Sequence, residues 1–395
     1  MRPDLQEAFI ERVTPESYRR CKDELNAWLG MEIGYRVCEM PIFLSSGMRI
    51  TLERAAADIV KQCVRPDYVA QSDVTLSPEH TVPRQNDRPL FSVVDFAICT
   101  DDDGNFVPKL IELQGFPSLF GYQYLYASTM RDFYGVHDVT PTLSGLSEQH
   151  YFDVLKRAVF ATHDPAECAL LEVDPEHQKT RTDFIAMERY IGLQTIDIRS
   201  VRKEGMHLMA ERNGRTIRLR RIFNRAIVDE LDDMGVALPF AWTDDLDVEW
   251  AGHPNWYFRI SKYSLPFLKH ATVPDTIFTN DSTSIPDDLN GYVLKPLFSF
   301  AGKGVNINPV KADIDAIPID QRDKWVLQRK VVYAPCVATP YGMNKVEIRI
   351  MLVWFDDAAE PMPVMSLART GRGELMGARY NVDPWTGSSG CLSAP

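Results

Sequence analysis

The sequence lacks any long hydrophobic run. Its longest apolar stretches, such as IMLVWF at 350–355, fall far short of the ~20 residues that a membrane-spanning helix needs. The first residues, MRPDLQEAFIERV, contain no apolar core of the kind found in a signal peptide. We therefore expect a cytoplasmic protein with no membrane partner.

Paired cysteines are also missing. The seven cysteines are odd in number, lie far apart in the chain and never form a C-x-x-C pair. A disulfide framework or a zinc site needs paired spacing, so we expect reduced thiols in the core. The eight histidines are equally scattered and show no transition-metal spacing.

An excess of positive charge is absent as well. The chain has 43 Lys and Arg against 55 Asp and Glu, a net charge of −12. This balance argues against a general nucleic-acid-binding protein but leaves room for a local basic site for an anionic ligand. What remains is the composition of a globular protein of 395 residues, 45% hydrophobic and 25% charged, long enough for two or three domains.

The chain divides into three parts by pattern. The first begins with helices and continues with two strands, LFSVVDFAIC and VPKLIELQG, whose acidic turn predicts an antiparallel hairpin. The second alternates helix and strand patterns, as an α/β layer does. The third combines a helix, a glycine turn and further strands. We expect an α+β or α/β protein with parts at 1–150, 151–250 and 251–395.

Two carboxylates stand inside the predicted hairpin. Asp95 lies in the first strand, and Glu112 and Gln114 share one face of the second, because strand side chains alternate. An unpaired carboxylate costs several kcal/mol to bury, so these groups need a cation. Two carboxylates and an amide oxygen suit Mg²⁺ that is completed by water and phosphate oxygens. The alternative is a surface hairpin with one wet face.

Two glycine-containing segments are compatible with anion binding. In VLKPLFSFAGKGVNI, Lys295 ends a strand ahead of Gly302, Lys303 and Gly304, a turn whose N–H groups are unobstructed. Neither the P-loop pattern nor the dinucleotide fingerprint is met, and an ordinary glycine hairpin is the alternative. In LARTGRGELMG, Arg369 precedes a glycine turn, which suits either an anion or a solvated arginine.

Taken in order, these segments resemble the circularly permuted ATP-grasp ligases, namely glutathionylspermidine synthase and the eukaryotic type of glutathione synthetase. Those families place an Asp on one strand and a Glu-x-Asn on the next, ahead of two ATP lysines. Here the segments VDFAI and LIELQGFPSLFG precede Lys262 by about 150 residues. The resemblance extends loosely over residues 90–380, and the permuted order is its most specific part.

The resemblance implies an ATP-grasp fold, with antiparallel sheets around a nucleotide cleft and a smaller α/β substrate domain. The metal ligands it implies for Mg²⁺ are Asp95, Glu112 and Gln114. The ATP contacts it implies are Lys262, Lys295, Gly302, Lys303, Gly304, Gln328 and Lys330. The substrate or phosphoryl contacts it implies are Arg369 and Arg225, although a surface position for Arg225 is an open alternative.

The reaction implied is ATP-dependent ligation of a small-molecule carboxylate to an amine through an acyl phosphate. Two alternatives stay open: a nucleotide-binding protein without ligase activity, and a kinase-like phosphotransferase on the same fold. The sequence does not fix the two substrates. It also leaves the oligomeric state open, with a homodimer as one option.

Three positions depart from the pattern of these families. Gln114 replaces an Asn, Ser299 stands near the place of a metal-binding Glu, and Val93 replaces a substrate-binding Arg. The first two leave the number of metal ions open. The third argues against a glutathione-like substrate.

Overall fold

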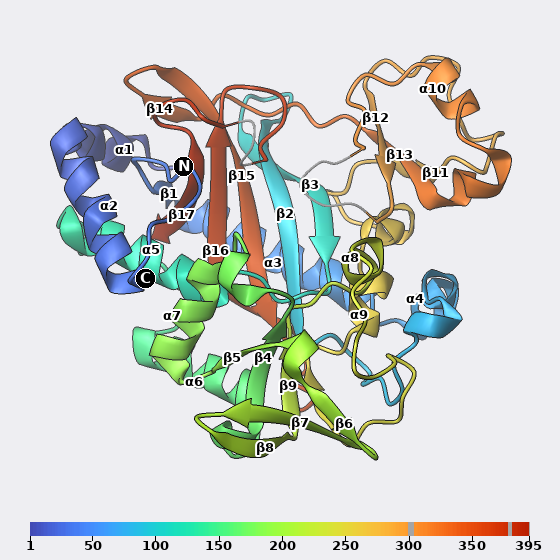
Figure 1. The fold of residues 1–395 in the computed structure, drawn as a ribbon. Helices are drawn as coiled ribbons and strands as arrows, with labels where there is room; N and C mark the ends of the chain where they lie inside the picture. Colours follow the sequence, from blue (N-terminus) through green and yellow to red (C-terminus); the bar gives the residue numbers. More distant parts are fainter. Residues whose placement is uncertain (299–303, 378–380, 395) are drawn as a thin grey trace.

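A central, mostly antiparallel sheet organises the protein (Figure 1). The computed structural model describes residues 1–298, 304–377 and 381–394. Within them the sheet has seven strands in the order β1-β17-β16-β15-β2-β3, and β14 pairs with β15. The strands come from both ends of the chain: β1 (Ile42–Leu44), β2 (Phe91–Thr100), β3 (Phe106–Gln114), β14 (Val337–Thr339), β15 (Gly342–Val353), β16 (Met362–Gly371) and β17 (Gly387–Ser393).

Helices from the first third of the chain cover one face and one end of this sheet. Helix α3 contacts β2, β3, β15 and β16, and its apolar residues pack with Val94, Phe96 and Ile98. The other helices of this group gather around β1 and β17. The group consists of α1 (Pro3–Ile10), α2 (Pro15–Leu29), α3 (Ser46–Gln62) and α5 (Phe120–Phe133). The prediction of helices at the start of the chain is confirmed.

The opposite face of the sheet is divided into an apolar and a polar half. Phe91 and Val93 on β2 pack with Met351 and Val353 on β15 in a second apolar core. That core includes helices α6 (Glu148–Phe160) and α7 (Arg181–Ile191). Further along the same strands this face carries charged residues instead. Because strand side chains alternate, these charged residues turn away from α3 and toward the rest of the molecule.

Residues 168–251 build a parallel sheet beside the apolar half. Its order is β10-β9-β4-β5, and a small antiparallel sheet, β6-β7-β8, follows it. The strands are β4 (Cys168–Glu172), β5 (Thr195–Asp197), β6 (Arg202–Glu204), β7 (His207–Arg212), β8 (Arg215–Leu219), β9 (Arg221–Asn224) and β10 (Glu249–Ala251). The α/β layer predicted for this part is present.

A third antiparallel sheet stands beside the polar half (Figure 1, orange). It has the order β11-β13-β12 and is followed by a loop that returns to the central sheet. Its strands are β11 (Thr276–Phe278), β12 (Tyr292–Pro296) and β13 (Trp325–Arg329). The remaining α-helices are α4 (Pro66–Gln71), α8 (Val228–Asp233), α9 (Asn255–Arg259) and α10 (Lys311–Asp315). The 3₁₀ helices include η6 (Lys262–Phe267) and η7 (Ile319–Lys324).

Several sequence expectations can be compared with this fold. The hairpin is confirmed, because β2 and β3 pair with Asp95 opposite Glu112. The mixed α/β architecture with antiparallel sheets is confirmed too. The helix predicted around Lys262 is instead a 3₁₀ helix with Pro266 inside it, a residue that lacks the N–H needed to continue an α-helix.

Two of the absences noted in the sequence have structural counterparts. All seven cysteines are free and buried, as predicted for core thiols. Among the described residues, no helix combines the length and hydrophobicity needed to cross a membrane.

Candidate functional site

Strand register gathers five charged residues on the polar half of the central sheet. On β15, Arg349 lies opposite Asp95 of β2, and Glu347 lies opposite Arg369 of β16. Asp95 in turn lies opposite Glu112 of β3. Side chains opposite one another in a sheet are within contact distance. The polar half is therefore an ordered set of carboxylates and guanidinium groups.

Asp95 and Arg349 form a buried two-pronged ion pair. Arg349 donates from Nε to Oδ1 and from Nη2 to Oδ2 of Asp95, both at 2.6 Å. The two residues are 2% and 5% exposed. Burial opposes ionisation of Asp95, but the guanidinium groups of Arg349 and Arg369 outweigh it and lower the pKa of this carboxyl. Since both oxygens accept from Arg349, a metal ion at Asp95 would have to compete with this guanidinium for the carboxylate.

Arg369 is held between two carboxylates. Its Nη1 donates to Oε1 of Glu347 at 2.5 Å and lies 3.6 Å from Oδ2 of Asp95. The second oxygen of Glu347 accepts from the Tyr333 hydroxyl at 2.9 Å. Burial and two neighbouring carboxylates raise the pKa of Glu347, although Arg369 opposes the effect. One nitrogen of Arg369 is thus anchored while its side chain faces the cavity described below.

Two lysines predicted to contact ATP lie close to β3. Lys295 of β12 donates to Oε1 of Gln328 at 2.6 Å and to the Ile111 carbonyl at 3.1 Å. Lys262 of η6 has its Nζ 3.5 Å from Oε2 of Glu112. Burial, together with the charge of Lys262, lowers the pKa of Lys295 to about 8, despite the opposing carboxylate of Glu112. The structure brings both lysines next to the predicted metal-binding strand.

Glu112 and Gln114 share one face of β3, as predicted. The amide nitrogen of Gln114 donates to Oε1 of Glu112 at 3.1 Å. Among the residues that the structure describes, no group of three or more His, Cys, Asp and Glu side chains is arranged to hold a metal ion. Two oxygen-bearing side chains are nevertheless a sufficient protein contribution for Mg²⁺ when phosphates and waters complete the shell.

These side chains line a cavity of about 540 Å³ between the central sheet and the β11-β13-β12 sheet. We call it the basic cavity. The described residues that line this cavity include Arg349 but not Asp95. It carries eight basic and four acidic residues: Lys179, Arg225, Lys262, Lys295, Arg329, Lys330, Arg349, Arg369, Glu112, Glu230, Glu347 and Glu374. A chain with net charge −12 thus concentrates positive charge here.

Arg225 enters the basic cavity from the end of β9. It is 4% exposed, donates through Nη1 to the Pro117 carbonyl and stacks 4.8 Å from the Phe116 ring centre. Its Nε is buried and has no hydrogen-bond partner among the described residues. The alternative of a surface arginine is therefore wrong. Residues Lys179 and Thr180, just ahead of α7, line the same cavity.

The predicted nucleotide segments are only partly described. Gly302 and Lys303 lie outside the described residues, as does Ser299. Gly304 is described and has a φ of +75°, a conformation that glycine adopts without strain. Gln328 and Lys330 line the basic cavity, and Lys330 donates to Oδ1 of Asn308 at 3.0 Å. The structure thus places four predicted ATP contacts, Lys262, Lys295, Gln328 and Lys330, around one cavity.

The glycines after β3 have a packing reason. A Cβ on Gly115 would lie 2.4 Å from the Trp256 carbonyl oxygen, and one on Gly121 would lie 2.9 Å from the Met187 nitrogen. Backbone approaches this close allow only glycine. Close packing of β3 against α9 and of α5 against α7 therefore accounts for both residues without a ligand.

Sequence reasoning missed Arg349, Glu347 and Tyr333. A signal was present in the segment EIRIMLVWF, where Glu347 and Arg349 stand two residues apart in an otherwise apolar strand. The same pattern drew attention to Glu112 and Gln114. Arg349 also lies on the same face of the sheet as Val93, since Arg349 is opposite Asp95 and Val93 and Asp95 are two residues apart on β2.

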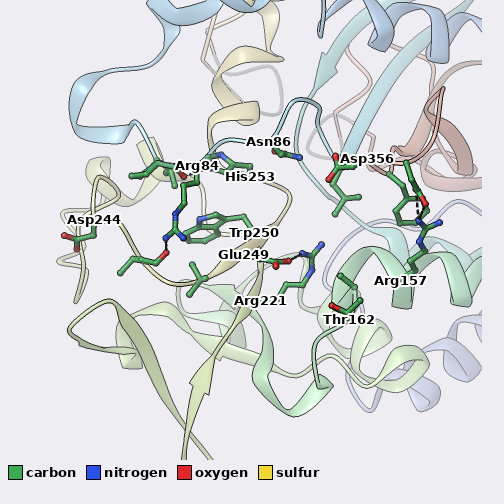
Figure 2. Close-up of a pocket in the computed structure, with 18 residues that line it drawn as sticks. Arg84, Asn86, Arg157, Thr162, Arg221, Asp244, Glu249, Trp250, His253 and Asp356 are labelled. Atoms are coloured by element: carbon green, nitrogen blue, oxygen red, sulfur yellow. Dashed lines mark hydrogen bonds and ion pairs between the residues drawn. The ribbon is translucent and has the colours of Figure 1, made fainter.

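A second cavity, of about 570 Å³, opens near β9, β10 and the β15–β16 turn (Figure 2). We call it the paired cavity, because each of its arginines has an acidic partner. Arg157 lies 2.6 Å from Asp357, Arg221 lies 2.6 Å from Glu249, and Arg84 lies 2.9 Å from Asp245. Trp250 forms part of its wall (Figure 2).

Comparisons with known proteins bear on the fold. No family model matches the chain, and no curated protein matches it by sequence. Among solved structures, the chain is similar to a glutathione synthetase-like effector from Globodera pallida in its apo form. The TM-score is 0.62 and the sequence identity 11%, over 95% of this chain and 96% of the other. The chain therefore has an overall fold similar to that of a glutathione synthetase-like protein.

Proposed function

We propose that the protein is an ATP-dependent carboxylate–amine ligase of the circularly permuted ATP-grasp type. The observation that carries this proposal is the charge of the basic cavity, where eight basic residues face four acidic ones in an acidic protein. A cavity of this sign attracts polyanions such as ATP and acidic substrates. The similarity in fold to a glutathione synthetase-like protein supports the same class.

The lysines and the β13 residues would bind the nucleotide. Lys262 and Lys295 come from separate elements and converge beside Glu112, which suits them to the phosphates of ATP. Gln328 and Lys330, at the end of β13, would meet the base. The turn at Gly302, Lys303 and Gly304 would cover the phosphates and exclude water from the acyl phosphate.

Glu112 and Gln114 are the residues that would hold Mg²⁺. To do so, the Gln114 amide turns its oxygen to the ion and gives up its donation to Glu112. The bound ion would neutralise charge on the β- and γ-phosphates. Asp95 is left out of this set, because Arg349 occupies both of its oxygens.

In the reaction, a substrate carboxylate oxygen attacks the γ-phosphorus and the bond to the β-phosphate oxygen breaks, which yields ADP and an acyl phosphate. The amine then attacks the acyl carbon, phosphate leaves, and the amine loses a proton to give the amide. Arg369, anchored at one nitrogen by Glu347, would stabilise the negative charge on the transferred group. Arg225, which lines the same cavity, would bind a carboxylate of the acid substrate.

A released-phosphate assay tests the proposal. The protein is incubated with ATP, Mg²⁺ and pools of amino acids, small peptides and polyamines, and products are identified by mass spectrometry. We expect ADP and phosphate in equal amounts with an amide, and only when both an acid and an amine are present. A stable phosphorylated product would identify a phosphotransferase instead. Tight ATP binding without turnover over the whole panel would identify a nucleotide-binding protein without ligase activity.

A further inference from the structure

Three buried or half-buried arginine side chains, each in or just after a different strand, line the basic cavity. Arg225 follows β9, Arg349 lies in the middle of β15, and Arg369 lies near the end of β16. Arg349 and Arg369 share Asp95, at 2.6 Å and 3.6 Å. Burial lowers the pKa of Arg225, the carboxylates of Glu172 and Asp183 oppose this effect, and repulsion from Arg349 adds to it. Arg349 is thus close enough to influence Arg225, and it shares a carboxylate with Arg369.

Acceptors among the described residues pair with only some of the N–H donors of these three arginines. Within the described part of the chain, Arg349 donates only from Nε and Nη2, and Arg369 only from Nη1. Arg225 donates from Nη1 to a carbonyl, and its buried Nε has no partner among the described residues. Buried guanidinium groups need acceptors, and all three arginine side chains line the basic cavity, where an oxyanion would supply them. Electrostatic repulsion between the arginines would be relieved by the same oxyanion.

We propose that Arg225, Arg349 and Arg369 form an oxyanion-binding subsite that works without a metal ion, with Asp95 as the positioning residue that holds Arg349 and Arg369. The sequence resemblance implied a metal-binding role for Asp95. In the structure both oxygens of Asp95 accept hydrogen bonds from Arg349, and this fixed guanidinium supplies positive charge where the resemblance implied a metal ion. Arginine suits this task because its planar fork pairs with Asp95 on one side and leaves other N–H groups for a ligand.

The ligand class is an oxyanion, and its source rests on the proposed function. It is either the γ-phosphoryl group of ATP or a carboxylate of the acid substrate, since both present oxygens that match a guanidinium. A binding experiment can distinguish the two sources. ADP lacks the γ-phosphoryl group, and a simple dicarboxylate resembles the acid substrate.

Titration calorimetry in EDTA tests this subsite without any catalytic step. The probes are ATP, ADP and the straight-chain dicarboxylates from malonate to adipate. The variants are Arg349→Met, Asp95→Asn and the double variant Asp95→Asn with Arg349→Gln. The double variant removes both charges but keeps polar groups in place, so it can be used if a single variant fails to fold. Arg157→Met is the matched control, because Arg157 lines the paired cavity and also pairs with an aspartate (Figure 2).

We expect the double variant to lose at least about tenfold in affinity for one probe. The control variant should bind that probe as the wild type does. A loss for ATP with no loss for ADP assigns the subsite to the γ-phosphoryl group, and a loss for a dicarboxylate assigns it to the acid substrate. Asp95→Asn should weaken the same probe in EDTA. The inference is wrong if all probes bind the variants as they bind the wild type, or if the wild type binds none without metal.

Two further results separate this subsite from the proposed function. A separate titration with Mn²⁺ is carried out without EDTA. If Asp95→Asn weakens only the binding of Mn²⁺, Asp95 is a metal ligand and the inference fails, whether or not the protein is a ligase. If the subsite binds as expected but no amide forms in the ligase assay, the proposed function fails and the subsite stands.

Discussion

The two cavities have nearly the same volume, about 540 and 570 Å³, and opposite charge organisation. In the paired cavity, Arg84, Arg157 and Arg221 each have an acidic partner within 3 Å. In the basic cavity, positive residues outnumber negative ones by two to one, and a buried nitrogen of Arg225 lacks a partner among the described residues. Volume therefore does not distinguish the two cavities, whereas the balance of charge among their lining residues does.

Ion pairs within the central sheet explain how the fold tolerates so many basic residues in one cavity. Part of its charge is balanced within the central sheet by the Asp95–Arg349 and Glu347–Arg369 pairs. Truncating one partner of a buried pair typically costs about 3–5 kcal/mol, so these pairs are fixed features of the sheet. A bound anion would stabilise the remaining lysines and arginines.

The largest expected effect comes from Glu112→Gln in the basic cavity. Loss of its charge should lower Mg-ATP turnover by at least about 100-fold, because no other side chain of β3 offers a carboxylate to the ion. The melting temperature should stay within a few degrees, since Glu112 is partly exposed and lies in a cluster of ligand-binding groups. Phosphate release and thermal unfolding are the measurements. Collapse of the fold would show that Glu112 is structural.

A smaller effect is expected from Lys295→Ala. This change removes a buried positive charge that faces Glu112 and Lys262, and it should weaken nucleotide binding by about tenfold or more. Calorimetric titration with ATP measures the loss. Lys324→Ala, a change at the end of a 3₁₀ helix outside the cavity lining, is the matched control and should bind as the wild type does. Unchanged affinity in Lys295→Ala would remove this lysine from the site.

The pH dependence of nucleotide binding should follow Lys295. Its pKa is lowered from 10.5 to about 8, so above pH 8 the free protein increasingly holds the neutral amine. Affinity for ATP should therefore fall a few-fold as the pH rises through 8, while this group's contribution to stability increases between pH 8 and 10.5. Lys295→Arg, which stays charged, should flatten the affinity profile. A profile equally steep in that variant would contradict the assignment.

The smallest effect is expected in the paired cavity. Arg157 is about half exposed and pairs with an exposed aspartate, an arrangement that contributes little. Arg157→Met should therefore change ATP affinity by less than about twofold and the unfolding free energy by less than about 1 kcal/mol. Loss of ATP binding in this variant would contradict the contrast between the cavities, because it would place the nucleotide in the paired cavity.

The sequence predicted the part of the site that rests on local pattern. The β2–β3 hairpin and the facing of Asp95 and Glu112 follow from alternation and an acidic turn, and both are present. Gln114 and Glu112 share a face for the same reason. Lys295 was found because a strand ends there before glycines, and it lies in the cavity as expected.

The part that the sequence could not supply depends on strand pairing across long distances. Arg349 pairs with Asp95 from 254 positions away, and nothing within either segment specifies that register. On this pairing rests our proposal that Asp95 is an anchor for arginines, where the sequence had suggested a metal ligand. The buried position of Arg225 likewise depends on packing against Phe116, which belongs to a different part of the chain.

A crystal structure with Mg²⁺ and a non-hydrolysable ATP analogue tests the central claim most directly. We predict that the analogue occupies the basic cavity, with its phosphates between Lys262, Lys295 and Glu112 and its base near Gln328. An analogue in the paired cavity, or in the basic cavity with its phosphates turned away from both lysines, would contradict the account.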